Sequence, residues 1–400
     1  MSDSPPKEPQ EPIAPLAESS PTTTRAWFKG LTEPRHRGRL ILLSSIVLVV
    51  IGASLAAYQR YFASEPAPAA VTEGLLPTVT VAEAETRPSS LDGTSVSPEL
   101  ADQRPLAVMI ENHPDARPQA GLSEAGAVWE AMVEGGITRF MALYAPRSAS
   151  KIGPVRSART QYLHWAAGYK ALYAHAGGSQ GALALIPTLS GIVDLPHTAA
   201  YFHREPQPGI ASEHTLFTST SELYDFAKEK GASLTADFGE IRFSQDGALA
   251  DRPASASVSV DFSTDSYKVD WTYDREKNHY TRSLAGSPHV DKVSGDQLTA
   301  KNIVVLVVER SFNPNTNQGK GEWTYVTEGA GKVYIFHEGI MSQGTWKKER
   351  KDTLLKLYYE HGEEIPLVAG ATWYEVIPPD REAFLTHSET AVDTSTEPSA

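Results

Sequence analysis

A run of 20 residues without a charged side chain, 40–59, constrains this chain more than any other feature. At a rise of about 1.5 Å per residue, a helix of that length crosses a hydrocarbon core of about 30 Å. Five basic residues and one acidic residue lie between 25 and 39, whereas Arg60 is the only basic residue directly after the run. The positive-inside rule therefore predicts a single transmembrane helix, with residues 1–39 as a disordered cytoplasmic tail and the remainder extracytoplasmic.

The main alternative to an anchor is a cleaved signal peptide. Signal peptides carry an apolar region of about 7–15 residues close to the N-terminus. The run here is longer and starts later, so an uncleaved anchor in the cell membrane is favoured. An extracytoplasmic location permits disulfides, but the chain has no cysteine. Disulfides, thiolate metal ligands, a cysteine nucleophile and a lipid-modified cysteine are therefore all excluded.

The composition narrows the class of protein further. Lys and Arg number 36 and Asp and Glu 49, which gives a net charge of 36 − 49 = −13. An acidic chain repels phosphate, so nucleic acid is not an expected partner. The 7 Trp, 16 Tyr and 12 Phe exclude a wholly disordered chain.

The pattern of apolar and polar residues predicts an α+β protein with two folded domains. Apolar runs such as 105–110 alternate with helix-like stretches at first, and later segments alternate in a period of two between Gly, Asn, Asp and Pro turns. Trp346 and Trp373, in the later part, are interpreted as core anchors. The predicted segments are a disordered tether (60–101), a mixed α/β domain (102–250), a smaller, mostly β domain (251–380) and a disordered tail (381–400).

The first candidate site is a predicted hairpin. Two β-prone runs flank a Gly-Gly pair at 135–136, as in turns that need positive φ at both central residues. A two-residue turn puts Met132 opposite Arg139, so that Arg139 shares one face with Glu130 and Glu134. Arg139 could then hold an anionic ligand while a carboxylate transfers a proton. A purely structural Arg–carboxylate network is the alternative.

A basic segment follows the hairpin. Ser157 is a plausible N-cap for a helix that continues to about Ala167. The start of a helix favours anions, and here it is flanked by Arg156 and Arg159, with Lys151 nearby. The planar guanidinium group suits phosphate or carboxylate. The alternative is that these arginines pair with acidic residues of the same domain.

A glycine-rich turn is the third candidate. An apolar strand ends at His175 and opens through Gly177, Gly178 and Ser179 onto a helix-like stretch. The glycines permit a tight turn beside a site, and residues 177–181 also spell G-x-S-x-G, the pattern of a nucleophile elbow. A serine hydrolase would need a later acid and histidine. Those available are Asp194, His197, His203 and His214.

No metal or other cofactor is expected. The three histidines between 194 and 217 have spacings that match no standard zinc motif. Loop residues of this kind more often line a cleft than coordinate an ion.

Several motifs together resemble the YerB-like family of bacterial envelope lipoproteins, whose two domains have no established activity. The motifs are 105–117 (PLAVMIENHPDAR), 133–139 (VEGGITR), 152–159 (IGPVRSAR), 174–179 (AHAGGS), 280–282 (YTR), 289–291 (HVD), 344–347 (GTWK) and 372–373 (TW). The resemblance covers about 102–379 and implies an α/β domain followed by a β-rich domain at the outer face of the membrane.

The chain departs from the family pattern in three places. A predicted membrane helix stands where the family often has a lipid-modified cysteine. The run 206–209 (PQPG) replaces the usual second basic residue near Arg204, and Thr215 follows His214 in place of asparagine. The arginines at 139, 156 and 159 and the histidine at 175 keep the pattern.

Three functions remain open from the sequence. The leading hypothesis is a membrane-anchored protein that binds an anionic envelope ligand, a phosphorylated lipid carrier or a wall glycopolymer, through Arg139, Arg156 and Arg159 near His175. The second is an envelope enzyme, either a phosphotransferase or a hydrolase that uses Ser179. The third is a non-catalytic scaffold for envelope proteins.

Overall fold

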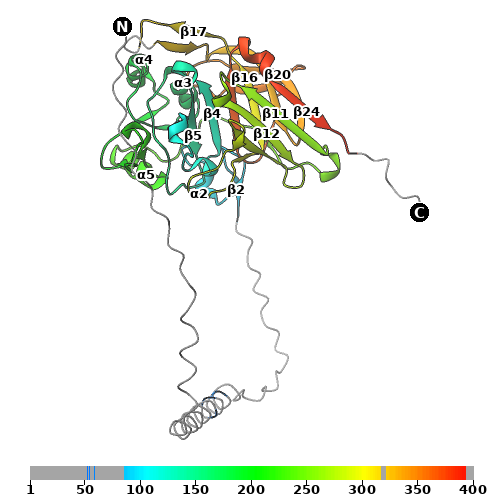
Figure 1. Cartoon of the computed structure of the whole chain (residues 1–400), viewed down its shortest axis with the longest axis horizontal. Helices are drawn as coiled ribbons and strands as arrows, with labels where there is room; N and C mark the ends of the chain where they lie inside the picture. The colour runs from blue at the N-terminus through cyan, green and yellow to red at the C-terminus, as the bar shows by residue number, and fades with distance from the viewer. Residues whose placement is uncertain (1–51, 53, 55–57, 59–84, 317–320, 393–400) are drawn as a thin grey trace, which may run out of the picture. The chain divides into compact units, whose positions relative to one another are not determined.

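Figure 1 shows the whole chain as a computed structural model. The structure describes residues 52, 54, 58, 85–316 and 321–392. Two compact units divide the chain, Met1–Val81 and Ala82–Ala400, and the elements discussed below belong to the second. The predicted membrane span, 40–59, lies outside the described residues except at three positions. No helix within the described ranges is long and apolar enough to cross a membrane.

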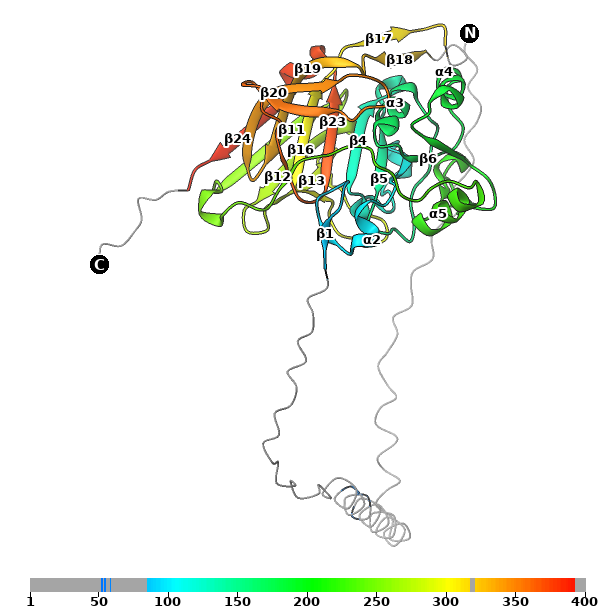
Figure 2. The ribbon, with the colours of Figure 1, turned by 180° about the vertical axis from the view of Figure 1, so that it is seen from behind.

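A ten-stranded mixed sheet runs through the second unit (Figures 1 and 2). In spatial order its strands are β21 (Lys356–Tyr359), β20 (Ile340–Lys348), β19 (Gly329–His337), β16 (Asn302–Val307), β23 (Thr372–Ile377), β4 (Ala127–Met132), β5 (Thr138–Tyr144), β3 (Leu106–Glu111), β6 (Leu172–His175) and β7 (Val193–Pro196). Strand β23 pairs in parallel with β4, with Thr372 opposite Ala127. The β-rich C-terminal part therefore extends the sheet that the α/β part begins.

The central strands are buried along their whole length and are mostly apolar, because both faces of the sheet are covered. Strands β3, β4, β5, β16 and β23 are buried at every position. This double burial explains why the sequence shows continuous apolar runs, such as the predicted strand 105–110, which the structure confirms as β3.

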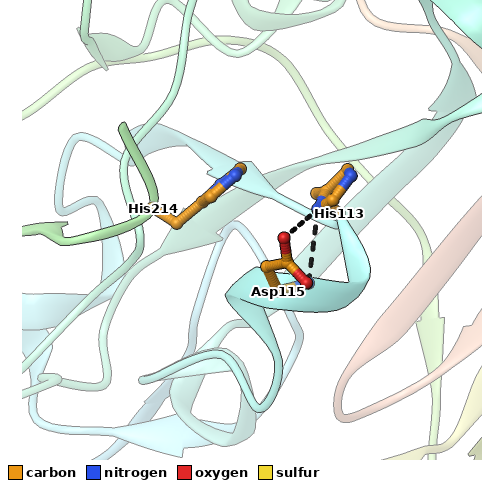
Figure 3. A group of neighbouring side chains, drawn as sticks. All are labelled: His113, Asp115 and His214. Carbon is orange, nitrogen blue, oxygen red and sulfur yellow. Dashed lines mark hydrogen bonds and ion pairs between the residues drawn. The ribbon is translucent and has the colours of Figure 1, made fainter. Parts of the chain in front are cut away.

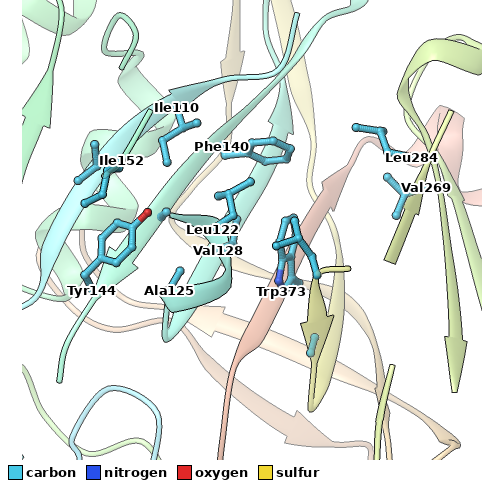
Figure 4. Close-up of a cluster of buried hydrophobic side chains, with 14 of the residues drawn as sticks. Ile110, Leu122, Ala125, Val128, Phe140, Tyr144, Ile152, Val269, Leu284 and Trp373 are labelled. Atoms are coloured by element: carbon cyan, nitrogen blue, oxygen red, sulfur yellow. The ribbon is translucent and has the colours of Figure 1, made fainter. Parts of the chain in front are cut away.

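A six-stranded antiparallel sheet covers one face. Its strands are β14 (Ser287–Pro288), β13 (His279–Leu284), β12 (Lys268–Asp274), β11 (Ser255–Asp261) and β24 (Thr386–Thr390), with β15 (Thr299–Ala300) paired to β13. Alternate residues of β11–β13 are buried, which is the period expected of a sheet with one face on the core. Figure 4 shows Val269 and Leu284 of this sheet in the same apolar cluster as Phe140 and Trp373 of the large one.

Helices complete the two outer layers. The helices are α2 (Pro98–Ala101), α3 (Thr160–Gly168), α4 (Gln180–Leu185) and α5 (Thr220–Glu229). Helix α3 packs on the face opposite the small sheet, where Trp165 stacks on Trp129 with ring centroids 4.7 Å apart. Tyr374 also stacks on Trp129, at 4.2 Å. Helix α5 packs through Leu223 and Phe226 on the same face as the small sheet.

Short strand pairs and 3₁₀ turns connect these layers. The pairs are β1 (Arg87–Pro88) with β2 (Ser95–Val96), β8 (His203–Arg204) with β9 (Leu216–Phe217), β10 (Phe243–Ser244) with β22 (Leu367–Val368), and β17 (Arg310–Asn313) with β18 (Glu322–Tyr325). The 3₁₀ turns are η1 (Pro114–Ala116), η2 (Leu122–Glu124), η3 (Glu134–Gly136), η4 (Ile186–Thr188), η5 (Ser212–His214), η6 (Leu249–Asp251), η7 (Asp265–Tyr267) and η9 (Pro379–Phe384). The β17–β18 hairpin lies beside α3 and α4 (Figures 1 and 2).

Regular structure begins earlier and ends later than the sequence predicts. The predicted tether reaches residue 101, but β1, β2 and α2 fold between 87 and 101, and Leu91 is buried. The predicted tail starts at 381, but β24 pairs with β11 inside it. These polar stretches take regular structure because they pair with, or pack on, strands from distant parts of the chain.

Candidate functional site

The register of the β4–β5 hairpin separates the residues that the sequence groups together. Glu130 lies opposite Phe140, and Ala131 lies opposite Arg139. The predicted two-residue turn is wrong, because the connection folds as the 3₁₀ turn Glu134–Gly136 with both glycines at positive φ. A slip of one residue moves side chains to the other face of a strand. Glu130 and Arg139 therefore point to opposite sides of the sheet.

Glu130 lies at the interface between the two sheets. It is fully buried and accepts hydrogen bonds from Thr138 Oγ1 at 2.6 Å and Asn112 Nδ2 at 3.2 Å. Its second carboxylate oxygen accepts a hydrogen bond from Arg282 of the small sheet. Glu375 lies opposite Glu130 on the neighbouring strand β23. Burial, reinforced by the charge of Glu130, raises the pKa of Glu375 well above its usual range.

Arg282 is the cation that pairs with this buried group of acidic side chains. Its side chain is fully buried, and its guanidinium carbon lies 4.4 Å from the ring centroid of Trp373 and 5.5 Å from those of Trp271 and Phe140. It also contacts Nδ1 of His289, whose pKa burial lowers well below its usual value. Arg282 and His289 belong to two of the motifs noted in the sequence, and both are buried and bonded within the fold.

Arg139 and Arg156 share the carboxylate of Glu111 on the other side of the sheet. Arg139 NH2 lies 4.0 Å from Glu111 Oε1, and its NH1 donates to the carbonyl oxygen of Ser157 at 3.1 Å. Burial, with Arg159 nearby, lowers the pKa of Arg139 to about 10. Arg156 Nε donates to Glu111 Oε2. Burial alone would raise the pKa of Glu111, but the two arginines outweigh it and the pKa is lowered.

Arg159 is held by Glu134 in a bidentate pair. Arg159 Nε lies 2.5 Å from Glu134 Oε1, and NH2 lies 2.9 Å from Oε2. Helix α3 starts at Thr160 with Arg159 at its N-cap, so the predicted cap at Ser157 is wrong by two residues. The side chain of Arg159 is only 9% exposed, whereas that of Arg156 is 25% exposed. Of the three arginines, Arg156 is the one that reaches solvent most.

The glycine-rich turn and Ser179 also form hydrogen bonds within the fold. Ser179 is the N-cap of α4: its Oγ accepts from Ala182 N–H at 3.2 Å and donates to Glu322 of β18 at 2.5 Å. The strand–turn–helix context predicted for 171–186 is confirmed. Gly177 has a φ of 66° and accepts from His175 Nδ1 at 2.6 Å.

Both ring nitrogens of His175 face oxygen acceptors within the fold. Its Nε2 lies 2.9 Å from Asp194 Oδ1, and its Nδ1 is taken by Gly177. Gly178, the second glycine, forms a β-bridge with Ala158. The triad that the sequence suggested is not assembled among the described residues, because Ser179 donates to Glu322 and Asp194 pairs with His175. None of the later histidines, His197, His203 and His214, takes the place of the base.

Five surface hollows among the described residues have linings that contain none of the three arginines. The largest of the five, about 590 Å³, lies around Lys170, Phe238 and Arg350. Arg139, Arg159, His175 and Ser179 are buried, whereas Arg156 is partly exposed and Gly177 is exposed.

Comparison with known proteins agrees with this architecture. Residues 91–233 match the model described as "Protein of unknown function (DUF3048) N-terminal domain", and residues 258–374 match the corresponding C-terminal domain. The chain belongs to the DUF3048 family. It is 31% identical over 296 residues to "Putative lipoprotein YerB" of Bacillus subtilis, covering 72% of this chain and 85% of the relative. The YerB-like resemblance noted in the sequence is thereby confirmed.

A crystal structure of the same Bacillus subtilis protein shares the fold. The TM-score is 0.65 at 29% sequence identity, over 75% of this chain and 99% of the YerB chain. Trp346 and Trp373 are buried here, as predicted for core anchors.

One group of DUF3048 residues that the sequence did not bring together is suited to a cation. His113, Asp115 and His214 offer ligand atoms within 4.8 Å of one another (Figure 3). His113 is the N-cap of turn η1, Asp115 lies in that turn, and His214 lies in η5. Sequence spacing could not reveal the group, because His214 was weighed only with the histidines close to it in the chain.

Proposed function

We propose that this chain is a membrane-associated protein of the bacterial cell envelope whose folded part is a non-catalytic scaffold for other envelope proteins. The uncharged run at 40–59 and the lipoprotein name of the Bacillus subtilis relative support the membrane association. A single-pass anchor with a cytoplasmic N-terminus then holds the two-sheet body outside the membrane.

The observation that carries the scaffold proposal is the bidentate pair of Arg159 with Glu134. A guanidinium group with two of its nitrogens hydrogen-bonded to one carboxylate has few donors left for a phosphate or a second carboxylate. Ser179 and His175 are likewise bonded within the fold. A ligand would have to displace these internal partners, at the desolvation cost of leaving a charge unpaired.

Two measurements test the non-catalytic part of the proposal. A fluorophosphonate probe is expected to leave Ser179 unmodified in the full chain, because the serine hydroxyl donates to Glu322 and no imidazole among the described residues bonds to it. Photo-crosslinking in intact cells is expected to give defined adducts with envelope proteins, unchanged by Arg159→Met in folded protein. A covalent adduct at Ser179, or an absence of protein adducts from the folded body, would contradict the proposal.

Binding of an anionic envelope ligand is the second candidate, and Arg156 is the observation that favours it. Three guanidinium groups face the two carboxylates of Glu111 and Glu134, and Arg156 is the most exposed of the three. A second carboxylate, that of Glu213, lies 3.9 Å from Arg156 NH2, and its side chain is half exposed. A phosphate could therefore reach Arg156 from solvent without entering the core.

Calorimetric titration with a polyprenyl-phosphate analogue separates the two candidates. The scaffold proposal expects no saturable binding to the full chain. Binding that is lost in Arg156→Ala and retained in Arg350→Ala would favour the anionic ligand. Arg350 is a suitable control because it is exposed and paired with Asp352 at 3.1 Å, away from the arginine group.

A further inference from the structure

Two histidines and an aspartate from distant segments meet at one end of strand β3. His113 and Asp115 lie in the turn that follows the strand, and His214 lies 101 residues after His113 in η5. The two imidazole rings stack with centroids 5.0 Å apart and planes inclined by 13°. Asp115 points toward the pair in Figure 3. The three ligand atoms lie within 4.8 Å of one another.

The spacing of His113 and Asp115 already suits a shared cation. Nδ1 of His113 lies 3.6 Å from Oδ2 of Asp115. Two ligands of a tetrahedral zinc ion, at about 2.0–2.2 Å from the metal, are separated by about 3.4 Å. The Nδ1 atom accepts only a long hydrogen bond, 3.3 Å, from the N–H of Asp115. A cation can replace that bond at small cost.

An independent observation on His214 points to the same chemistry. The residue is 8% exposed, and its Nδ1 is buried without a hydrogen bond in the part of the chain that the structure describes. The nearest carboxylate oxygen, Glu111 Oε2, lies 3.7 Å away, beyond hydrogen-bond range. A metal-bound histidine usually donates its other ring N–H to a carboxylate. If Nε2 of His214 binds the cation, Nδ1 carries the proton and faces Glu111.

The donor set selects the kind of cation. Two imidazole nitrogens and one carboxylate oxygen suit zinc and neighbouring transition metals, whereas magnesium and calcium prefer oxygen ligands alone. Three protein ligands also leave one tetrahedral position open. The side chains of Asp115 and His113 are 62% and 36% exposed, so a cation can enter and they can rotate onto it.

We propose that His113, Asp115 and His214 form a binding site for a divalent transition cation of the zinc type. The bound ion joins η5 to the turn after β3 and so connects two segments of the α/β part. It adds to the scaffold proposal and does not depend on it, because it concerns a different set of side chains.

Titration of the full chain, purified in detergent and freed of metal with a chelator, tests the site. Zinc is expected to bind with a stoichiometry of one and to raise the melting temperature, and magnesium at equal concentration is expected to do neither. Asp115→Asn and His113→Ala are expected to weaken zinc binding at least tenfold. These two changes lie at partly exposed positions, so the variants should remain folded even if His214→Ala does not.

His361→Ala is the matched control. His361 is exposed and lies 3.5 Å from a neighbouring carboxylate, Glu363, in the same way as His113 lies beside Asp115. Zinc binding should survive this change, and also His203→Ala, which removes a histidine that lies between Glu205 and Glu222. The proposal is overturned if the wild-type chain takes up no zinc, or if Asp115→Asn and His113→Ala bind it as tightly as wild type.

Discussion

Replacing Arg282 by methionine is expected to destabilise the fold severely. The change keeps much of the apolar volume among Phe140, Trp271 and Trp373 but removes the only guanidinium group that contacts Glu130 among the described residues. Breaking a buried ion pair by removing one partner costs about 3–5 kcal/mol, because the other charge stays buried and uncompensated. At about 2–4 °C per kcal/mol for a large domain, the melting temperature should fall by roughly 6–20 °C.

Thermal and urea unfolding of the full chain measure this effect. The double variant Glu130→Gln with Arg282→Met is expected to be more stable than Arg282→Met alone, since it no longer leaves a carboxylate without its cation. Lys228→Met is the control, because it removes one partner of an exposed ion pair with Asp225 and should leave the melting temperature nearly unchanged.

The reasoning is refuted by either of two results. One is a loss of less than about 1 kcal/mol for Arg282→Met, which is within the range of ordinary substitutions. The other is strict additivity of the Glu130 and Arg282 changes, which would mean that the two side chains do not stabilise each other across the sheets.

Three further changes test other parts of the polar core. Burial raises the pKa of Glu375, so wild-type stability should fall as the pH rises from about 4.3 toward the folded-state pKa, and Glu375→Gln should remove that slope in urea unfolding across pH. Burial lowers the pKa of His289, so its contribution is complete above about pH 6.5 and is lost as the pH falls, and His289→Gln should reduce that acid sensitivity. Tyr162→Phe removes the hydroxyl that bonds to Ala131 N and O at 3.0 Å, and should cost about 1–3 kcal/mol in urea unfolding.

The limits of the sequence are clearest at the β4–β5 hairpin. Both strands were predicted from apolar pattern and two glycines, and both form. Their register was not, because it depends on whether Glu134 extends a strand or enters the turn. Pairing with Arg159 on another element favours the turn. One residue of register then decides that Glu130 faces Arg282 and not Arg139.

The ion-pair partners of the charged side chains could not be predicted from the sequence either. Arg156 and Arg159 are unusual in an acidic chain, and this made a ligand the leading interpretation. Their carboxylates, Glu111 and Glu134, lie 45 and 25 residues away in sequence. Local charge counts cannot distinguish an open basic site from a set of internal ion pairs.

The sequence by itself determined the features that depend on neighbouring residues: the uncharged run, the apolar strands, the mixed α/β texture and the family motifs. Only the tertiary structure decided that β23 joins β4 in one sheet, that Arg282 neutralises Glu130, and that His214 meets His113 and Asp115. These local features can be read from the order of apolar and polar residues along a short stretch of chain. Contacts between distant segments follow from packing two sheets together, and no short stretch of sequence encodes that packing alone.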